Sequence, residues 1–140
     1  MATTTTNFGF DIPTSSDLVK NGATAIAELG QDIDTKFAGL TINAQTGTTY
    51  TLVSGDVNKL VTLNNAAAIT VTIPNGVFTT GQQINLQQLG AGQVSIVSDG
   101  TTVLTSTGAT STAPKLRAQY SAATIVCTSS NNFTVIGDLS

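Results

Sequence analysis

Few residues in this chain could carry out chemistry. It contains no histidine and a single cysteine, Cys127. It therefore cannot form a Ser-His-Asp triad, a Cys-His pair or, within one chain, a tetrahedral zinc site. Cys127 lies in an alternating segment on the same side as Ile125, which predicts a small core residue and not a nucleophile. A lone cysteine also allows no disulfide bond within the chain.

The eight acidic residues do not form a convincing catalytic pair. Glu28 and Asp32 are four residues apart, so on a helix they share a face. Paired carboxylates can hydrolyse glycosides, but no aromatic platform accompanies this pair, and a solvated helix face explains it better. Asp56 and Asp99 stand in turn sequences, where Asp side chains bond to nearby backbone. We therefore expect no enzymatic activity, no cofactor and no metal site.

Charge is scarce along the whole chain. Charged residues make up 9% of it, against about 25% in typical domains, and the net charge is −3. The five basic residues are scattered, which excludes a nucleic-acid partner because such binding needs several phosphate contacts on one basic face. No run of apolar residues is long enough to insert into a membrane, and the first residues lack the regions of a secretory signal. We expect the protein to be made in a cytoplasm.

Uncharged polar residues take the place of charge. Thr, Ser, Asn and Gln account for 55 of the 140 residues, and many alternate with apolar residues in the candidate strands. Ordinary monomers use charge on such faces for solubility and to block edge pairing. Removing water from a threonine-rich face at a contact with another subunit costs less free energy than removing it from a charged face. The composition thus favours an oligomer or array over its alternative, a weakly charged monomer.

Residues 1–15 are predicted to form an extended attachment arm. Four consecutive threonines and Pro13 disfavour a helix here. The expected anchors are Phe8, Phe10 and Ile12, which alternate and so point to one side of an extended chain. The arm either packs on its own domain or pairs with another subunit or with the protein beneath it.

Residues 16–40 are predicted to form an amphipathic helix. Apolar residues recur there at intervals of three, four and seven, and Gly22 and Gly30 weaken the helix. So short a helix is marginal alone, hence it needs a partner. That partner is either the β-domain of its own chain or two further copies in a parallel trimer, with this segment as the trimer axis. The predicted interface residues are Val19, Ile26, Leu29, Ile33, Phe37 and Leu40.

Residues 41–140 are predicted to form an antiparallel β-domain. Apolar and polar residues alternate, as in Ile69, Val71 and Ile73. Turn sequences such as Pro74-Asn75-Gly76 separate the candidate strands at short intervals. This pattern is typical of a β-sandwich or a jelly-roll-like barrel.

Two stretches resemble virion proteins of tailed bacteriophages. The first reads NFGFDIP at 7–13, with DLVKNGA and IAELGQDID at 17–34, and is similar to the N-terminal segment of tail fibre and minor tail proteins. The second runs from YTLV at 50–53 through LGAGQV at 89–94 to KLRAQYSAAT at 115–124. It ends with IGDL at 136–139 and looks like a β-domain that recurs at the ends of phage fibres and appendages.

The resemblance implies a non-enzymatic structural role and a homotrimer. The chain lacks the repeated shaft of a long fibre. We therefore expect a capsid decoration protein or short head fibre on the virion surface, attached through its arm and helix to the major capsid protein. The alternative is a short tail-tip or baseplate fibre, attached to a tail or baseplate protein, that binds a host receptor.

Overall fold

The computed structural model describes residues 3–5, 9–12, 19–106 and 113–140 of the chain. The chain divides into two compact units, Met1–Leu40 and Thr41–Ser140. The first, the helical unit, contains a small hairpin and the helix. The second, the β-domain, contains the remaining strands.

The described part of the attachment arm folds back on itself. β1 (Thr3–Thr4) and β2 (Asp11–Ile12) pair antiparallel. Gly9 between them has a φ of 68°, a left-handed conformation that glycine adopts without steric cost. The prediction of a single extended arm is therefore wrong, because Thr3 and Thr4 pair with the strand β2 of the same segment.

The helix α1 (Val19–Phe37) lies within the predicted segment 16–40. β2 lies against it, so the hairpin and the helix share one small unit. Among the described residues, no helix is both long and apolar enough to cross a membrane.

The β-domain is built from short strands joined by tight corners. In chain order its elements are β3 (Ile42–Gln45), β4 (Thr49–Thr51), the 3-10 helix η1 (Ser54–Asp56), β5 (Leu60–Leu63), β6 (Ile69–Ile73), β7 (Gln83–Gln88), β8 (Val94–Ser98), β9 (Val103–Ser106), β10 (Ala122–Ser129) and β11 (Asn132–Gly137).

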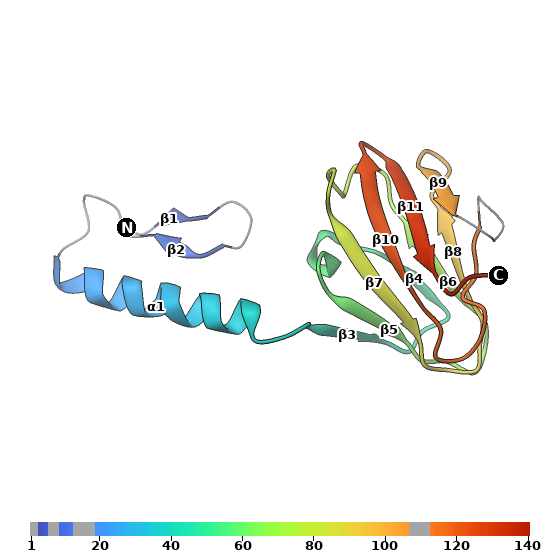
Figure 1. Ribbon diagram of the computed structural model, residues 1–140, viewed down its shortest axis with the longest axis horizontal. Coiled ribbons are helices and arrows are strands. Elements are labelled where there is room, and N and C mark those ends of the chain that lie inside the picture. The colour runs from blue at the N-terminus through green and yellow to red at the C-terminus, as the bar shows by residue number, and fades with distance from the viewer. Residues whose placement is uncertain (1–2, 6–8, 13–18, 107–112) are drawn as a thin grey trace. The chain divides into compact units, whose positions relative to one another are not determined.

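The first six of these strands form a parallel β-solenoid (Figure 1). β3, β5 and β7 pair in parallel in one sheet, and β4, β6 and β8 pair in parallel in the other. The chain changes sheet at each corner, so two consecutive strands make one turn and about three turns stack. The predicted sandwich or jelly roll is therefore wrong. Alternation and turn residues look the same whether a strand pairs with the next strand or with the one after it.

The register stacks apolar residues of successive turns between the two sheets. Val61 pairs with Leu86, and Val71 pairs with Ile96. All four side chains are buried, so each turn covers the apolar face of the turn before it. Further enclosed core residues are Leu52, Leu63, Ile69, Ile73, Ile84, Val94, Leu116, Ile125 and Val135.

Consecutive corners of the solenoid approach one another closely at two glycines. The Gly92 N–H donates to the Asn65 carbonyl at 2.9 Å, and the Gly90 N–H donates to the Leu63 carbonyl at 3.2 Å. A Cβ atom added at Gly92 would lie 1.8 Å from the Ala67 carbonyl oxygen. Only glycine allows the third-turn corner to lie on the second-turn corner in this way.

The end of the chain closes one end of the solenoid. β10 pairs antiparallel with β7, β11 pairs antiparallel with β10, and β9 pairs parallel with β11. Phe133 on β11 packs edge-to-face on Phe78, with ring centroids 6.0 Å apart. The other end consists of β3 and β4, each the last strand of its sheet among the described residues.

Candidate functional site

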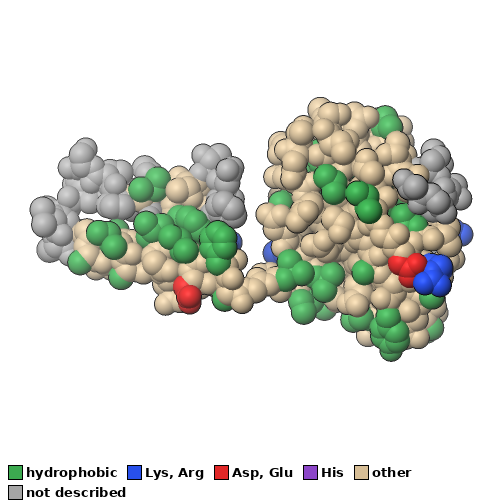
Figure 2. Space-filling view, viewed as in Figure 1, with side chains coloured by type: hydrophobic (Ala, Val, Ile, Leu, Met, Phe, Trp, Pro, Cys, Tyr) green, Lys and Arg blue, Asp and Glu red, His purple; other side chains and the backbone are tan. Residues whose placement is uncertain are grey.

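A line of large apolar side chains runs along α1. Ile26, Ile33 and Phe37 are 64%, 41% and 75% exposed. They are spaced by seven and four residues, so at 3.6 residues per turn they lie along one side of the helix. Hydrophobic side chains are visible along this unit in Figure 2. We call these three residues the apolar line.

The helical unit partly buries a different side of α1. The half-buried residues of α1 include Ala25, Leu29 and Asp32, which are spaced four and three residues apart. By helix geometry these positions lie about a quarter turn away from the apolar line. The hairpin and helix therefore leave the apolar line uncovered.

The remaining predicted interface residues are spread more widely. Leu29 is half-buried and lies beside the apolar line rather than on it. Leu40 is 53% exposed and follows the end of α1, so helix geometry does not align it with Phe37. The side chain of Val19 lies outside the described part of the structure.

The predicted arm anchors lie at the hairpin. Phe10 is half-buried and Ile12, in β2, is 39% exposed. Phe8 lies outside the described residues.

A buried carboxylate lies at the first turn of the solenoid. Asp56 is 1% exposed. It accepts hydrogen bonds from the Tyr50 hydroxyl at 2.9 Å, from Asn43 Nδ2 at 2.7 Å and from the Val53 N–H at 2.9 Å. Asn43 belongs to β3 and Tyr50 to β4, so the network joins the two sheets. From the sequence, we expected only hydrogen bonds between the Asp56 side chain and nearby backbone. The polar residues at inward-facing positions of β3 could also have indicated hydrogen bonds to side chains.

The Asp56 network stabilises the fold and offers no free group for catalysis. No buried side-chain nitrogen or oxygen lacks a hydrogen-bond partner, and no group of metal ligands occurs, among the described residues. Burial raises the pKa of Tyr50, and its hydrogen bond to Asp56 raises it further, which keeps the hydroxyl protonated as a donor. Cys127 is buried too, and burial raises the pKa of its thiol, as in an inert core cysteine.

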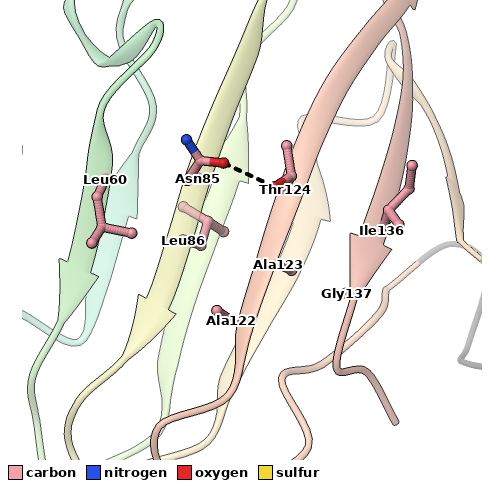
Figure 3. A pocket seen from close by; sticks show the side chains of 8 residues that line it. All are labelled: Leu60, Asn85, Leu86, Ala122, Ala123, Thr124, Ile136 and Gly137. Atoms are coloured by element: carbon pink, nitrogen blue, oxygen red, sulfur yellow. Dashed lines mark hydrogen bonds between the residues drawn. The ribbon is translucent and has the colours of Figure 1, made fainter. Parts of the chain in front are cut away.

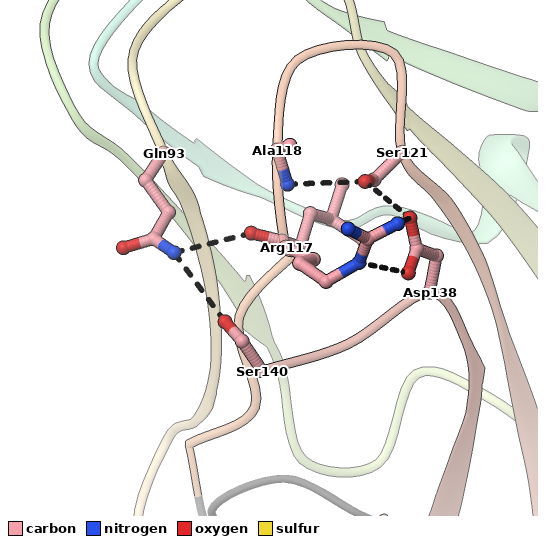
Figure 4. A network of polar contacts seen from close by, with 7 residues as sticks. Gln93, Arg117, Ala118, Ser121, Asp138 and Ser140 are labelled. Atoms are coloured by element: carbon pink, nitrogen blue, oxygen red, sulfur yellow. Dashed lines mark hydrogen bonds and ion pairs between the residues drawn. The ribbon is translucent and has the colours of Figure 1, made fainter.

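A second polar network ties the C-terminus to the loop before β10 (Figure 4). Arg117 donates to Asp138 from Nε at 2.6 Å and from Nη2 at 2.9 Å. The Ser121 hydroxyl donates to Asp138 Oδ2 at 2.7 Å and accepts from the Ala118 N–H at 3.0 Å. The guanidinium and carboxylate are 64% and 41% exposed, so solvent weakens the pair. The network's main effect is to fix the shape of the loop.

The pH dependence of stability should reveal this network. Arg117, and then Ser121, hold the pKa of Asp138 below its usual range. Stability from this carboxylate is therefore present above the unfolded pKa, about 3.9, and is lost as pH falls through the lower folded value. We expect a flat unfolding midpoint from neutral pH to about pH 5 and a fall below about pH 4.

Asp138→Asn should make that acid decline shallower when urea unfolding is followed by circular dichroism. The matched control is Asp34→Asn, which removes an exposed carboxylate from α1. An equally steep decline in Asp138→Asn and in the unsubstituted chain would show that the Arg117–Asp138 pair does not form in solution.

The outer face of the six-stranded sheet carries a shallow hollow of about 190 Å³. Leu60, Asn85, Thr124 and Ile136 pair in register across β5, β7, β10 and β11, and all line the hollow (Figure 3). Thr124 donates to Asn85 at 2.8 Å, which leaves a polar pair between two apolar walls. Gly137 also lines the hollow, and a Cβ atom there would lie 2.5 Å from the Ala122 carbonyl oxygen, so this position admits only glycine.

No protein-family model and no curated protein matches this chain. The surfaces of the chain that could serve a function are the apolar line of α1, the loop before β10 held by Arg117 and Asp138, and the hollow on the six-stranded sheet.

Proposed function

We propose that this chain is a non-enzymatic structural protein of the bacteriophage virion surface and assembles as a homotrimer. In this proposal it is a capsid decoration protein or a short head fibre. The arm and helical unit attach it to the major capsid protein, and the β-domain projects from the particle.

The observation that carries the proposal is the uncovered apolar line. Ile26, Ile33 and Phe37 expose three large apolar side chains on one side of a 19-residue helix. Burying such side chains is favourable by about 1.5–3 kcal/mol each. In a parallel three-helix assembly, the apolar line of each copy packs against the apolar lines of the two other copies. Isoleucine at core positions is compatible with a three-helix coiled coil. The two other copies thus supply the partner that the helix requires.

The surface of the β-domain is consistent with a crowded assembly. Among the described residues of this domain, no strand from β3 to β11 contains a charged residue. Its charged residues lie outside these strands, and one of them, Asp56 in η1, is buried. Charge-free sheet faces can lose water against neighbouring subunits without burying an unpaired ion.

Attachment should depend on the arm. We expect deletion of residues 2–12 to abolish binding to particles that lack the native copy, because it removes the hairpin and the described anchors Phe10 and Ile12. The β-domain should melt as before, since its core lies entirely within residues 41–140. Co-sedimentation with the particles measures binding, and the unsubstituted chain on the same particles is the control.

Binding of the truncated chain with unchanged affinity would contradict this role of the arm.

The number of copies per particle distinguishes the two virion locations. A number that scales with the capsid subunits supports the decoration protein or head fibre, whereas a handful supports a short tail-tip or baseplate fibre.

A further inference from the structure

The turn that follows β6 contains a sequence prone to a spontaneous reaction. Asn75 directly precedes Gly76. Once the backbone nitrogen of the following residue has lost its proton, it can attack the side-chain amide carbon of an asparagine, and glycine has no Cβ atom to hinder the approach. The other Asn-Gly pair of the chain, Asn21-Gly22, lies in α1, where the helical backbone fixes both residues. The turn therefore offers this reaction the freer backbone.

The side chain of Asn75 is free to react. It is exposed, and no described residue forms a hydrogen bond with its amide group. The amide of Asn65, by contrast, is held by a bond of 2.7 Å to the Thr46 carbonyl. Gly76 is exposed as well, and its φ of 71° lies in the left-handed region. Neither burial nor a bond to another side chain thus keeps the Asn75 amide away from the Gly76 nitrogen.

The Gly76 nitrogen is restrained by the turn between β10 and β11. Its N–H donates to Asn131 Oδ1 at 2.9 Å. Asn131 is one of three non-glycine residues with positive φ in the described chain, together with Asn58 and Tyr120. The Asn131 carbonyl accepts from the Val103 N–H at 2.8 Å, which holds the turn in place. The bond to Asn131 must break before the Gly76 nitrogen can attack, so Asn131 slows the reaction.

We propose that Asn75 is a site of spontaneous deamidation and that the side chain of Asn131 sets its rate. The deprotonated Gly76 nitrogen forms a bond to Cγ of Asn75, the Cγ–Nδ2 bond breaks, and the amide nitrogen leaves as ammonia after taking up a proton from water. Water then adds to either carbonyl carbon of the succinimide ring and leaves aspartate or isoaspartate. The reaction needs no oxidant, reductant or enzyme. This inference is independent of the homotrimer proposed above.

Either product would weaken the corner in which Asn75 lies. The Asn75 N–H donates to the carboxylate of Asp99, so a new carboxylate at this position comes close to an existing one of the same charge. Isoaspartate also adds a methylene group to the backbone of a turn that is tied at both Asn75 and Gly76. The turn leads to Phe78, which packs on Phe133. Deamidation would therefore loosen a closed corner of the β-domain.

Peptide mapping by mass spectrometry tests the proposal on the full-length protein, incubated in mildly alkaline buffer. We expect aspartate and isoaspartate to accumulate at Asn75 in the folded chain. Asn131→Gly removes the acceptor of the Gly76 N–H and suits the positive φ, so the variant should fold and should react about threefold faster or more at Asn75. Its rate at Asn21 should not change, because α1 belongs to the other unit.

Asn58→Gly is the matched control. It makes the same change at another positive φ, and no hydrogen bond joins Asn58 to the described residues 74–76, so Asn75 should react as in the unsubstituted chain. Hydrogen exchange of the unsubstituted protein should show a protected Gly76 N–H. A folded chain without product at Asn75, where the urea-unfolded chain reacts, would overturn the site. Equal rates for Asn131→Gly and Asn58→Gly, or an unprotected Gly76 N–H, would overturn the role of Asn131.

Discussion

Gly92→Ala is expected to unfold the β-domain. The new Cβ atom would lie 1.8 Å from the Ala67 carbonyl oxygen and 2.3 Å from the Ala67 carbonyl carbon. Both atoms belong to the backbone, so no side-chain rotation relieves the overlap, and the two stacked corners must separate. Their separation would also break the hydrogen bond from the Gly92 N–H to Asn65. We expect a loss of about 4 kcal/mol or more in the free energy of unfolding, which is large for a single methyl group.

Urea unfolding followed by circular dichroism measures this loss. The matched control is Gly55→Ala, because a Cβ atom there meets only a Val53 methyl group at 3.9 Å. This control should unfold within about 1 kcal/mol of the original chain. Equal midpoints for Gly92→Ala and Gly55→Ala would mean that the corners of the second and third turns do not stack. The parallel solenoid would then be wrong.

Ile33→Asp is expected to abolish the trimer. It places a carboxylate at the centre of the apolar line, and assembly would have to bury that charge without a partner at a cost of about 3–5 kcal/mol. The association constant should therefore fall by more than about a hundredfold. The β-domain should keep its own melting transition, since its core contains no residue of α1.

Gln31→Asp is the matched control for Ile33→Asp. It adds the same charge to the same helix at an exposed position off the apolar line, so the trimer should persist. If Ile33→Asp and Gln31→Asp assemble alike, the apolar line is not the subunit interface.

Part of this fold was readable from the sequence. Alternation placed Ile69, Val71 and Ile73 on one face of a strand, and all three are buried. Strand pairing was not readable, because alternation reports which side chains point inward and not which strand lies alongside. The glycines in LGAGQV marked a turn, but the stacking of that turn on Asn65 and Ala67 is a contact between distant parts of the sequence.

The candidate surfaces were readable to a smaller extent. Helical periodicity selected six residues, of which Ile26, Ile33 and Phe37 lie along one exposed side of α1, whereas Leu29 is half-buried and Leu40 follows the end of the helix. It did not reveal that the hairpin would share one unit with the helix and leave that side open. The positive φ of Tyr120 has no signature in the sequence, because residues 118–121 contain none of the glycine or asparagine that usually marks such a turn.

The mass of the full-length chain in solution tests the central claim most directly. Light scattering on the purified protein, over a series of dilutions, should give about 43 kDa, three times the chain mass of 14.2 kDa, at the upper concentrations. A stable monomer of 14.2 kDa throughout the series would contradict the trimer. The apolar line of α1 would then have to be covered within its own chain.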